Sequence, residues 1–78
     1  MVAIPTPKEI FAFNLRRLRS SAGISQEEMA ARAGLHRTYI SSVERAQRNI
    51  SLQNIFQLAA ALGTTPAELL KPVPKGCG

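Results

Sequence analysis

Residues 25–51 read SQEEMAARAGLHRTYISSVERAQRNIS, and this stretch decides the fold of the 78-residue chain. Two short helical patterns meet at Gly34, a residue type suited to the left-handed backbone that ends a helix. The second pattern has Ile40 and Val43 at helical spacing, and its other positions are mostly polar. A helix that only closed a core would not need that polar face, so the stretch predicts a helix-turn-helix at about residues 25–45.

The first of these two patterns carries its own start signal. Ser25 is followed three residues later by Glu28, the capping-box spacing at the beginning of a helix. The pattern ends after about two turns, and a helix of that length is unstable in isolation. We therefore expect it to be held by packing of its apolar side, Met29, Ala30 and Ala33, against neighbouring helices.

Three further helices are predicted around this unit. Before it, Phe11, Leu15, Leu18 and Ala22 share a helical face that Gly23 ends. After it, Ser51 caps a helix that Gly63 ends, with an inner side of Leu52, Ile55, Leu58, Ala59 and Leu62. A short last helix starts at Thr65, Pro66 and Glu68, as a cap, a first-turn proline and a reciprocal cap.

The chain is therefore expected to be all-α, with five helices and no strand. We assign residues 1–8 to a flexible N-terminal arm, 9–71 to one compact domain and 72–78 to a disordered tail. A chain of this length can bury one core and not two.

Charge and cysteine content narrow the function classes. The net charge is +5, and all seven arginines lie between Arg16 and Arg48, which favours a polyanionic partner. The alternative is that they only solubilise helix faces. The single cysteine, Cys77, allows no internal disulfide and no zinc cluster. No segment is long and apolar enough to span a membrane. We therefore expect a cytoplasmic protein.

The pieces NLRRLR, SQEEMAARAG, TYISSVER and LAAALGTTPAELL, in this order within residues 10–70, resemble the Cro/CI-type (XRE) helix-turn-helix family of phage and bacterial regulators. The resemblance implies a lambda-repressor-like five-helix DNA-binding domain. RTYIS..ER..RNIS is also similar to controller proteins of restriction-modification systems. Two positions depart from the family pattern: Ala46, where many relatives have glycine, and Ile50, where they have proline.

The resemblance implies a recognition helix at about residues 36–45 that lies in the major groove of double-stranded DNA. Arg37, near its start, has the fork geometry to bind guanine O6 and N7, or else serves as a phosphate clamp or an ion-pair partner. Thr38 is expected to meet a thymine methyl or a phosphate, and Ser41 and Ser42 a base edge, unless these hydroxyls are simply solvated.

A second set of residues is expected to bind phosphate without reading sequence. Gln26 is the first of them, because the family's glutamine at this helix start binds a phosphate; its alternative is an ordinary exposed side chain. Tyr39 either braces its helix with the ring while its hydroxyl meets a phosphate, or is simple packing. Glu44 is expected to make a structural ion pair with Arg45 or to cap the helix end. The whole candidate phosphate-binding set comprises Gln26, Arg16, Arg17, His36, Tyr39, Arg45, Arg48 and Asn49.

No enzyme, cofactor, metal site or small-molecule ligand is indicated. His36 is the only histidine and lacks a cluster of cysteines or carboxylates. The acids near the serines, Glu27, Glu28 and Glu44, are expected on exposed helical positions, without a nucleophile turn or phosphate loop.

A lone recognition helix reads few base pairs, so a symmetric homodimer on an inverted repeat is expected. Its candidate surface is Phe56, Pro66, Leu69 and Leu70; alternatively the two leucines close the monomer core and Phe56 is a scattered apolar residue. The leading hypothesis is a sequence-specific transcriptional regulator, either a repressor or an activator. The competing ones are an antitoxin-like protein and a protein-interaction module on the same scaffold.

Overall fold

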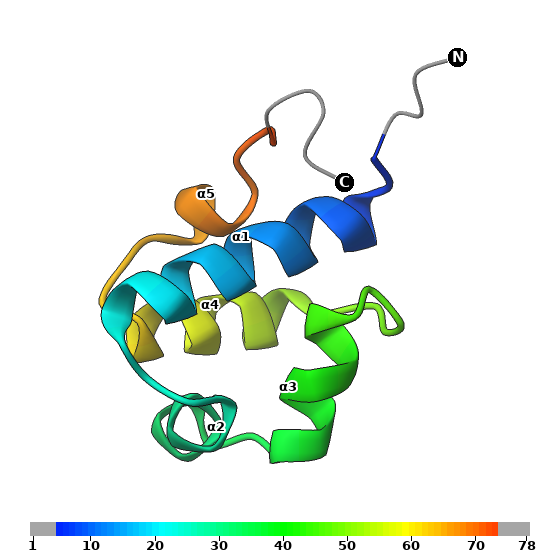
Figure 1. Ribbon diagram of the computed structural model, residues 1–78. Helices are drawn as coiled ribbons and strands as arrows, with labels where there is room; N and C mark the ends of the chain where they lie inside the picture. The colour runs from blue at the N-terminus through cyan, green and yellow to red at the C-terminus, as the bar shows by residue number, and fades with distance from the viewer. Residues whose placement is uncertain (1–4, 74–78) are drawn as a thin grey trace.

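The computed structural model describes residues 5–73 and contains five helices, with no strand in that range (Figure 1). The helices are α1 (Pro7–Ala22), α2 (Gln26–Ala33), α3 (Arg37–Glu44), α4 (Leu52–Ala61) and α5 (Pro66–Leu69). The all-α prediction is confirmed, and α2 and α3 form the expected helix-turn-helix.

The helices close around one core. In Figure 1, α2 and α3 form the lower edge of the molecule, below α1 and α4, and α5 lies at the upper edge. α3 packs on α1 and α2, α2 also packs on α4, and α5 packs on α1 and α4. Each helix supplies at least one fully buried side chain, among them Leu15, Met29, Ile40, Leu58 and Leu69. No helix is redundant, because each closes part of the same core.

Local capping sets most helix starts. The Ser25 hydroxyl oxygen accepts a hydrogen bond from the Glu28 N–H at 3.0 Å, and Ser51 caps Asn54 in the same way at 3.1 Å, so both predicted starts are confirmed. The Glu28 carboxylate does not close the box, because it pairs with an arginine one turn further on. Thr65 precedes α5, but its side chain makes no capping bond.

α1 begins earlier than expected. The Thr6 hydroxyl oxygen accepts from the Glu9 N–H at 3.2 Å, and the Glu9 carboxylate accepts from the Thr6 N–H at 2.8 Å, which is a complete capping box. The helix therefore starts at Pro7, inside the segment that was expected to be a flexible arm. Residues 1–4 and 74–78, which include the rest of that arm and Cys77, lie outside the described residues.

Two apolar positions assigned to inner faces are exposed. Leu52 has 72% of its surface exposed, although it continues the buried stripe of Ile55 and Ala59. A helical side chain leans toward the N-terminus of its helix, so one in the first position of α4 extends past the core. Ala22, at the last residue of α1, is also exposed.

The loop after α3 contains a strained residue. Gly23, Gly34 and Gly63 adopt positive φ angles of 71°, 71° and 67° where helices end, as their residue type allows. Ala46 has a φ of 59°, the only positive value of a non-glycine residue within residues 5–73. This is the position where the family pattern favours glycine, so here the alanine side chain is held in a left-handed conformation.

Replacing this alanine by glycine is expected to stabilise the protein. Ala46→Gly removes a left-handed conformational cost of roughly 1–2 kcal/mol and adds a glycine entropy cost of about 0.5–1 kcal/mol. The free energy of unfolding in urea should rise by about 0.5–1 kcal/mol. Ala31→Gly, at an exposed position inside α2, is the matched control and should lower it by a similar amount. A loss of stability in both variants would contradict the assigned strain.

Candidate nucleic-acid interface

The turn between α2 and α3 presents the start of α3 to solvent. Gly34 ends α2, and its N–H bonds to carbonyl oxygens in the last turn. The axes of α2 and α3 are steeply inclined to each other: Figure 1 shows α2 end-on and α3 from the side. Ile40 and Val43 bury the inner side of α3, whereas Arg37 and Thr38 are exposed in its first turn.

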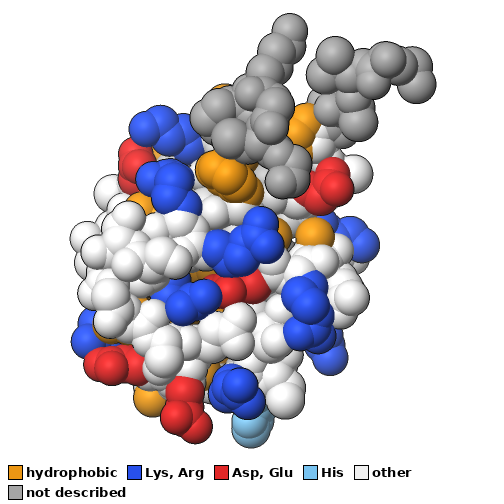
Figure 2. All heavy atoms as spheres, viewed as in Figure 1, with side chains coloured by type: hydrophobic (Ala, Val, Ile, Leu, Met, Phe, Trp, Pro, Cys, Tyr) orange, Lys and Arg blue, Asp and Glu red, His pale blue; other side chains and the backbone are white. Residues whose placement is uncertain are grey.

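Basic side chains gather on this face. Figure 2 shows lysine and arginine side chains over the face that α1 and α3 present, with the single histidine at the lower edge. His36 is the N-cap of α3, and its side chain makes no capping hydrogen bond. Within residues 5–73, no carboxylate lies within ion-pair distance of Arg37. The first turn of α3 therefore offers an exposed cation beside backbone N–H groups that no side chain caps.

The two serines of α3 are less available than its first turn. Both are half-buried. The Ser42 hydroxyl donates to the Tyr39 carbonyl oxygen at 2.8 Å, and the Ser41 hydroxyl oxygen accepts a hydrogen bond from Arg45. Each hydroxyl thus already has a partner on α3 or at its C-cap, which leaves Arg37 and Thr38 as the better exposed base-reading candidates.

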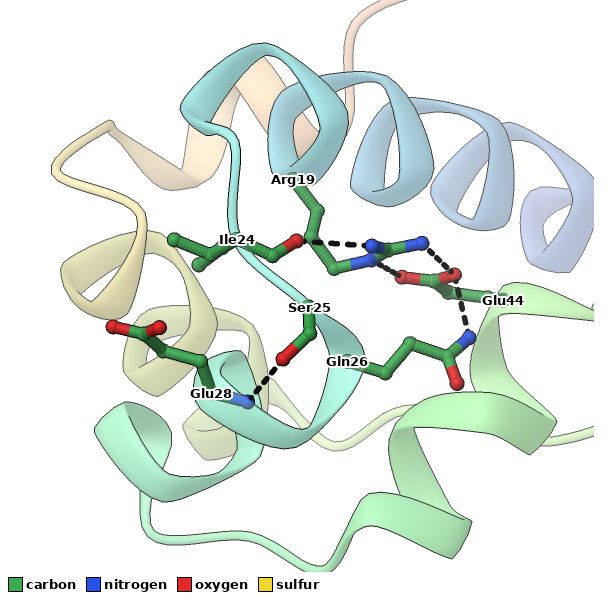
Figure 3. A network of polar contacts seen from close by, with 6 residues as sticks. All are labelled: Arg19, Ile24, Ser25, Gln26, Glu28 and Glu44. Carbon is green, nitrogen blue, oxygen red and sulfur yellow. Dashed lines mark hydrogen bonds and ion pairs between the residues drawn. The ribbon is translucent and has the colours of Figure 1, made fainter.

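A buried polar network joins α3 to α1 and α2 (Figure 3). Glu44, the last residue of α3, has only 3% of its surface exposed. Its carboxylate accepts from Arg19 Nε at 2.6 Å and Nη2 at 3.0 Å, and from Gln26 Nε2 at 2.9 Å. Arg19 also donates to the Ile24 carbonyl oxygen at 3.0 Å. The expected pairing of Glu44 with Arg45 is wrong, as is its expected exposure, because the carboxylate points inward toward α1.

The network fixes charge as well as geometry. The hydrogen bond from Arg19 to Glu44 raises the pKa of the Arg19 guanidinium above its ordinary value, and desolvation opposes this shift. Arg19 therefore keeps its charge at every pH at which a protein of this kind is handled. Gln26 is half-buried and held toward α3 by the same carboxylate.

The other candidate phosphate-binding residues lie on two sides of α3. Arg16 and Arg17 are exposed on α1, and Arg17 also donates to the Asn14 side-chain oxygen at 3.3 Å. Beyond α3, Arg45, Arg48 and Asn49 are exposed in the loop. The loop is therefore the second side from which cations flank the recognition helix.

Tyr39 joins this loop to α4. Its hydroxyl oxygen accepts a hydrogen bond from Asn54 Nδ2 at 3.0 Å, and Arg48 lies over its ring, 5.5 Å from the centroid. The ring packs against the core, so the bracing role expected of Tyr39 is present.

The sequence reasoning missed two residues of these networks. Arg19 lies four residues after the fully buried Leu15, so its helical position placed it near the core, and this signal pointed to a buried partner. Asn54 follows the Ser51 cap by three residues, and nothing in the local sequence distinguishes it from a solvated amide.

Three of the four residues predicted for the dimer surface are at least partly exposed, and one is buried. Phe56 and Leu70 are exposed over 57% and 53% of their surfaces, and Pro66 is half-exposed. Leu69 is fully buried, so its assignment to a surface is wrong: α5 uses it to close the protomer core. Leu52 lies one turn before Phe56 on α4 and extends the exposed apolar surface.

Neither a metal centre nor a membrane segment is found in the part of the chain that the structure describes. Residues 5–73 hold no group of three or more histidine, cysteine, aspartate or glutamate side chains that could bind a metal ion. None of the described helices combines the length and the apolar character needed to cross a membrane.

The comparisons with known proteins agree with this architecture. The helix-turn-helix family HTH_3 matches residues 15–69. A hypothetical transcription factor of Neisseria meningitidis is 49% identical over 65 residues, which cover 83% of this chain and 61% of that protein. Control protein C.SmaI of Serratia marcescens is 51% identical over 63 residues, covering 81% of this chain and 75% of the relative. The chain thus spans less than two thirds of the Neisseria relative.

A solved structure shows the same fold. The crystal structure of the restriction-modification controller protein C.AhdI from Aeromonas hydrophila matches with a TM-score of 0.78 and 50% identity. The match covers 80% of this chain and 94% of that one.

Removal of the buried carboxylate should destabilise the protein strongly. Glu44→Gln leaves the guanidinium of Arg19 without its counter-charge, and losing one partner of a buried ion pair costs about 3 kcal/mol. The free energy of unfolding in urea should fall by this amount. Glu28→Gln is the matched control, because its ion pair with Arg32 is exposed and worth about 0.5 kcal/mol or less. Equal losses in the two variants would refute the structural role of Glu44.

Proposed function

Because the chain belongs to the helix-turn-helix family HTH_3, we propose that it is a sequence-specific transcriptional regulator that binds double-stranded DNA. The observation that carries the proposal is the first turn of α3, where Arg37 and Thr38 are exposed on a helix whose other end is anchored by buried Glu44. A helix ~10–12 Å across fits the ~12 Å major groove of B-DNA.

The division of roles follows from exposure. Arg37 is the proposed base reader, because its planar fork can donate two hydrogen bonds to guanine O6 and N7. Thr38 is proposed beside it. Ser41 contributes through its hydroxyl proton and Ser42 through its hydroxyl oxygen, which their partners leave available. In this reading the base contacts concentrate in the first turn of α3.

Phosphate contacts are proposed on both sides of α3. Gln26 and the α2 N-terminus serve one side, together with Arg16 and Arg17 of α1. Arg45, Arg48 and Asn49 serve the other side, with Tyr39 and His36 next to α3. These contacts supply affinity that falls with rising salt, because each neutralised phosphate releases counterions.

We further propose that the regulator acts as a cytoplasmic homodimer on an inverted repeat, through Phe56, Pro66 and Leu70 with Leu52 added to this surface. Two recognition helices one helical turn of DNA apart, ~34–36 Å, would read twice as many base pairs. The exposed side chains of Leu52 and Phe56, one turn apart on α4, support this surface, since a large contiguous apolar patch on a protein surface often marks an interface.

The relatives suggest the biological setting. C.SmaI is named a control protein and C.AhdI a restriction-modification controller protein. We propose that this chain likewise controls genes of a restriction-modification system, with an operator close to its own coding sequence. Restriction and methyltransferase genes next to it would support this setting, and a toxin gene in their place would favour the antitoxin-like alternative.

Selection from a random-sequence pool of DNA duplexes tests the function directly. The purified protein at moderate salt should enrich an inverted repeat with half-sites about one helical turn apart. Arg37→Ala should then weaken binding to that site by ~1–3 kcal/mol and relax preference at one position. Equal weakening on every duplex would make Arg37 a phosphate contact. Salt-sensitive binding with no enriched sequence would refute sequence-specific regulation and favour a protein-interaction module.

A charge on α4 tests the dimer. Phe56→Glu should halve the mass measured by sedimentation equilibrium and weaken operator binding, because a carboxylate would be buried between the protomers. Ser20→Glu, at an exposed position on α1, is the control and should keep the dimeric mass. Unchanged mass and affinity in Phe56→Glu would exclude this surface.

A further inference from the structure

The side chain of Asn54 reaches from the first turn of α4 to α3. Its Nδ2 donates a hydrogen bond of 3.0 Å to the hydroxyl oxygen of Tyr39, and both residues are half-buried. A phenol hydroxyl carries one proton and can also accept. Since the amide occupies an acceptor site of the oxygen, the proton of Tyr39 remains available to a different acceptor. Asn54 therefore presents the Tyr39 hydroxyl as a donor.

A guanidinium shares this location. The Cζ of Arg48 lies 5.5 Å from the centroid of the Tyr39 ring, a cation–π distance that restricts an otherwise exposed side chain. Tyr39, Arg48 and Asn54 line a hollow of about 390 Å³ that also borders Thr38 and Ser42 on α3. The hollow thus brings a hydroxyl proton and a guanidinium together beside the proposed recognition helix.

We propose that Asn54 is a positioning residue for DNA binding, which holds the Tyr39 hydroxyl as a donor so that it and Arg48 bind one backbone phosphate. The inference rests on the proposed function and adds to it a residue of α4. A phosphate oxygen only accepts hydrogen bonds. The hydroxyl therefore contributes only while its proton points outward, and the amide of Asn54 enforces this polarity.

The substitution Asn54→Asp reverses that polarity and keeps the contact. The carboxylate accepts the Tyr39 proton, so the two side chains stay bonded while the hydroxyl no longer donates to phosphate. Tyr39→Phe removes the same donor, and a hydrogen bond to a charged group corresponds to about a tenfold loss in affinity. Asn54→Asp should lower the affinity for the selected operator at least as much as Tyr39→Phe does, as measured by fluorescence anisotropy.

Two further variants separate the effect of hydrogen-bond polarity at Tyr39 from the effect of an added charge. Gln53→Glu places the same charge on the exposed neighbour in α4 and should weaken binding less than Asn54→Asp. Asn54→Leu removes the amide donor without adding charge and should weaken binding by less than Tyr39→Phe, because the hydroxyl is then free to rotate. Urea unfolding identifies the conditions under which each variant is folded, and affinities are compared there.

The double variant Tyr39→Phe with Asn54→Asp gives the decisive measurement. If Asn54 acts through the hydroxyl, the combined loss is well below the product of the two single losses, because the second change removes nothing more. Losses that multiply, or an Asn54→Asp loss no greater than that of Gln53→Glu, would overturn the inference. Failure of this inference and failure of the proposed function are distinguishable. If the wild-type protein enriches no operator, the proposed function is wrong; if it enriches one and the variants behave otherwise than expected, only the role of Asn54 is wrong.

Discussion

The buried contact between Arg19 and Glu44 fixes the helix on which the candidate interface depends. α3 has eight residues, a length that does not hold a helix in water without tertiary support. Its last side chain is a carboxylate with 3% of its surface exposed, and a buried charge needs both a counter-charge and hydrogen bonds. Arg19 and Gln26 supply them from α1 and α2. The direction in which α3 points is thus set by two helices that precede it.

α3 is held from a second side by α4. The Tyr39 ring packs against the core while its hydroxyl bonds to Asn54, so contacts with different neighbouring helices restrain the rotation of this short helix. The third side carries Arg37 and Thr38 and remains exposed. A helix restrained in this way can present base-reading groups in one orientation, which limits the ordering cost of binding.

Ion pairing also decides which arginine charges remain exposed without a carboxylate partner. Arg19 neutralises Glu44 in the interior, and Arg32 pairs with Glu28 on α2. The other arginines lie exposed around α3, on α1 and in the loop that contains strained Ala46. These exposed arginines on α1, on α3 and in the loop carry positive charge that would draw a polyanion toward this part of the molecule.

The sequence determined the helices, because their signals are local. Ser25 and Ser51 cap the turns that follow them, and Gly34 ends α2 with the backbone that only glycine adopts easily. Spacing alone likewise placed Ile40 inside and Arg37 outside. These signals act within one turn of a helix, so they are readable without knowledge of the fold.

Only the tertiary structure decided which polar side chains bond to each other. Glu44 bonds to a residue 25 positions away, and Asn54 to one 15 positions away, and no local pattern encodes such pairs. Leu69 is buried and Leu52 exposed, although both belong to apolar helical patterns. Burial depends on whether another helix covers a position, and that follows only from how all five helices pack together.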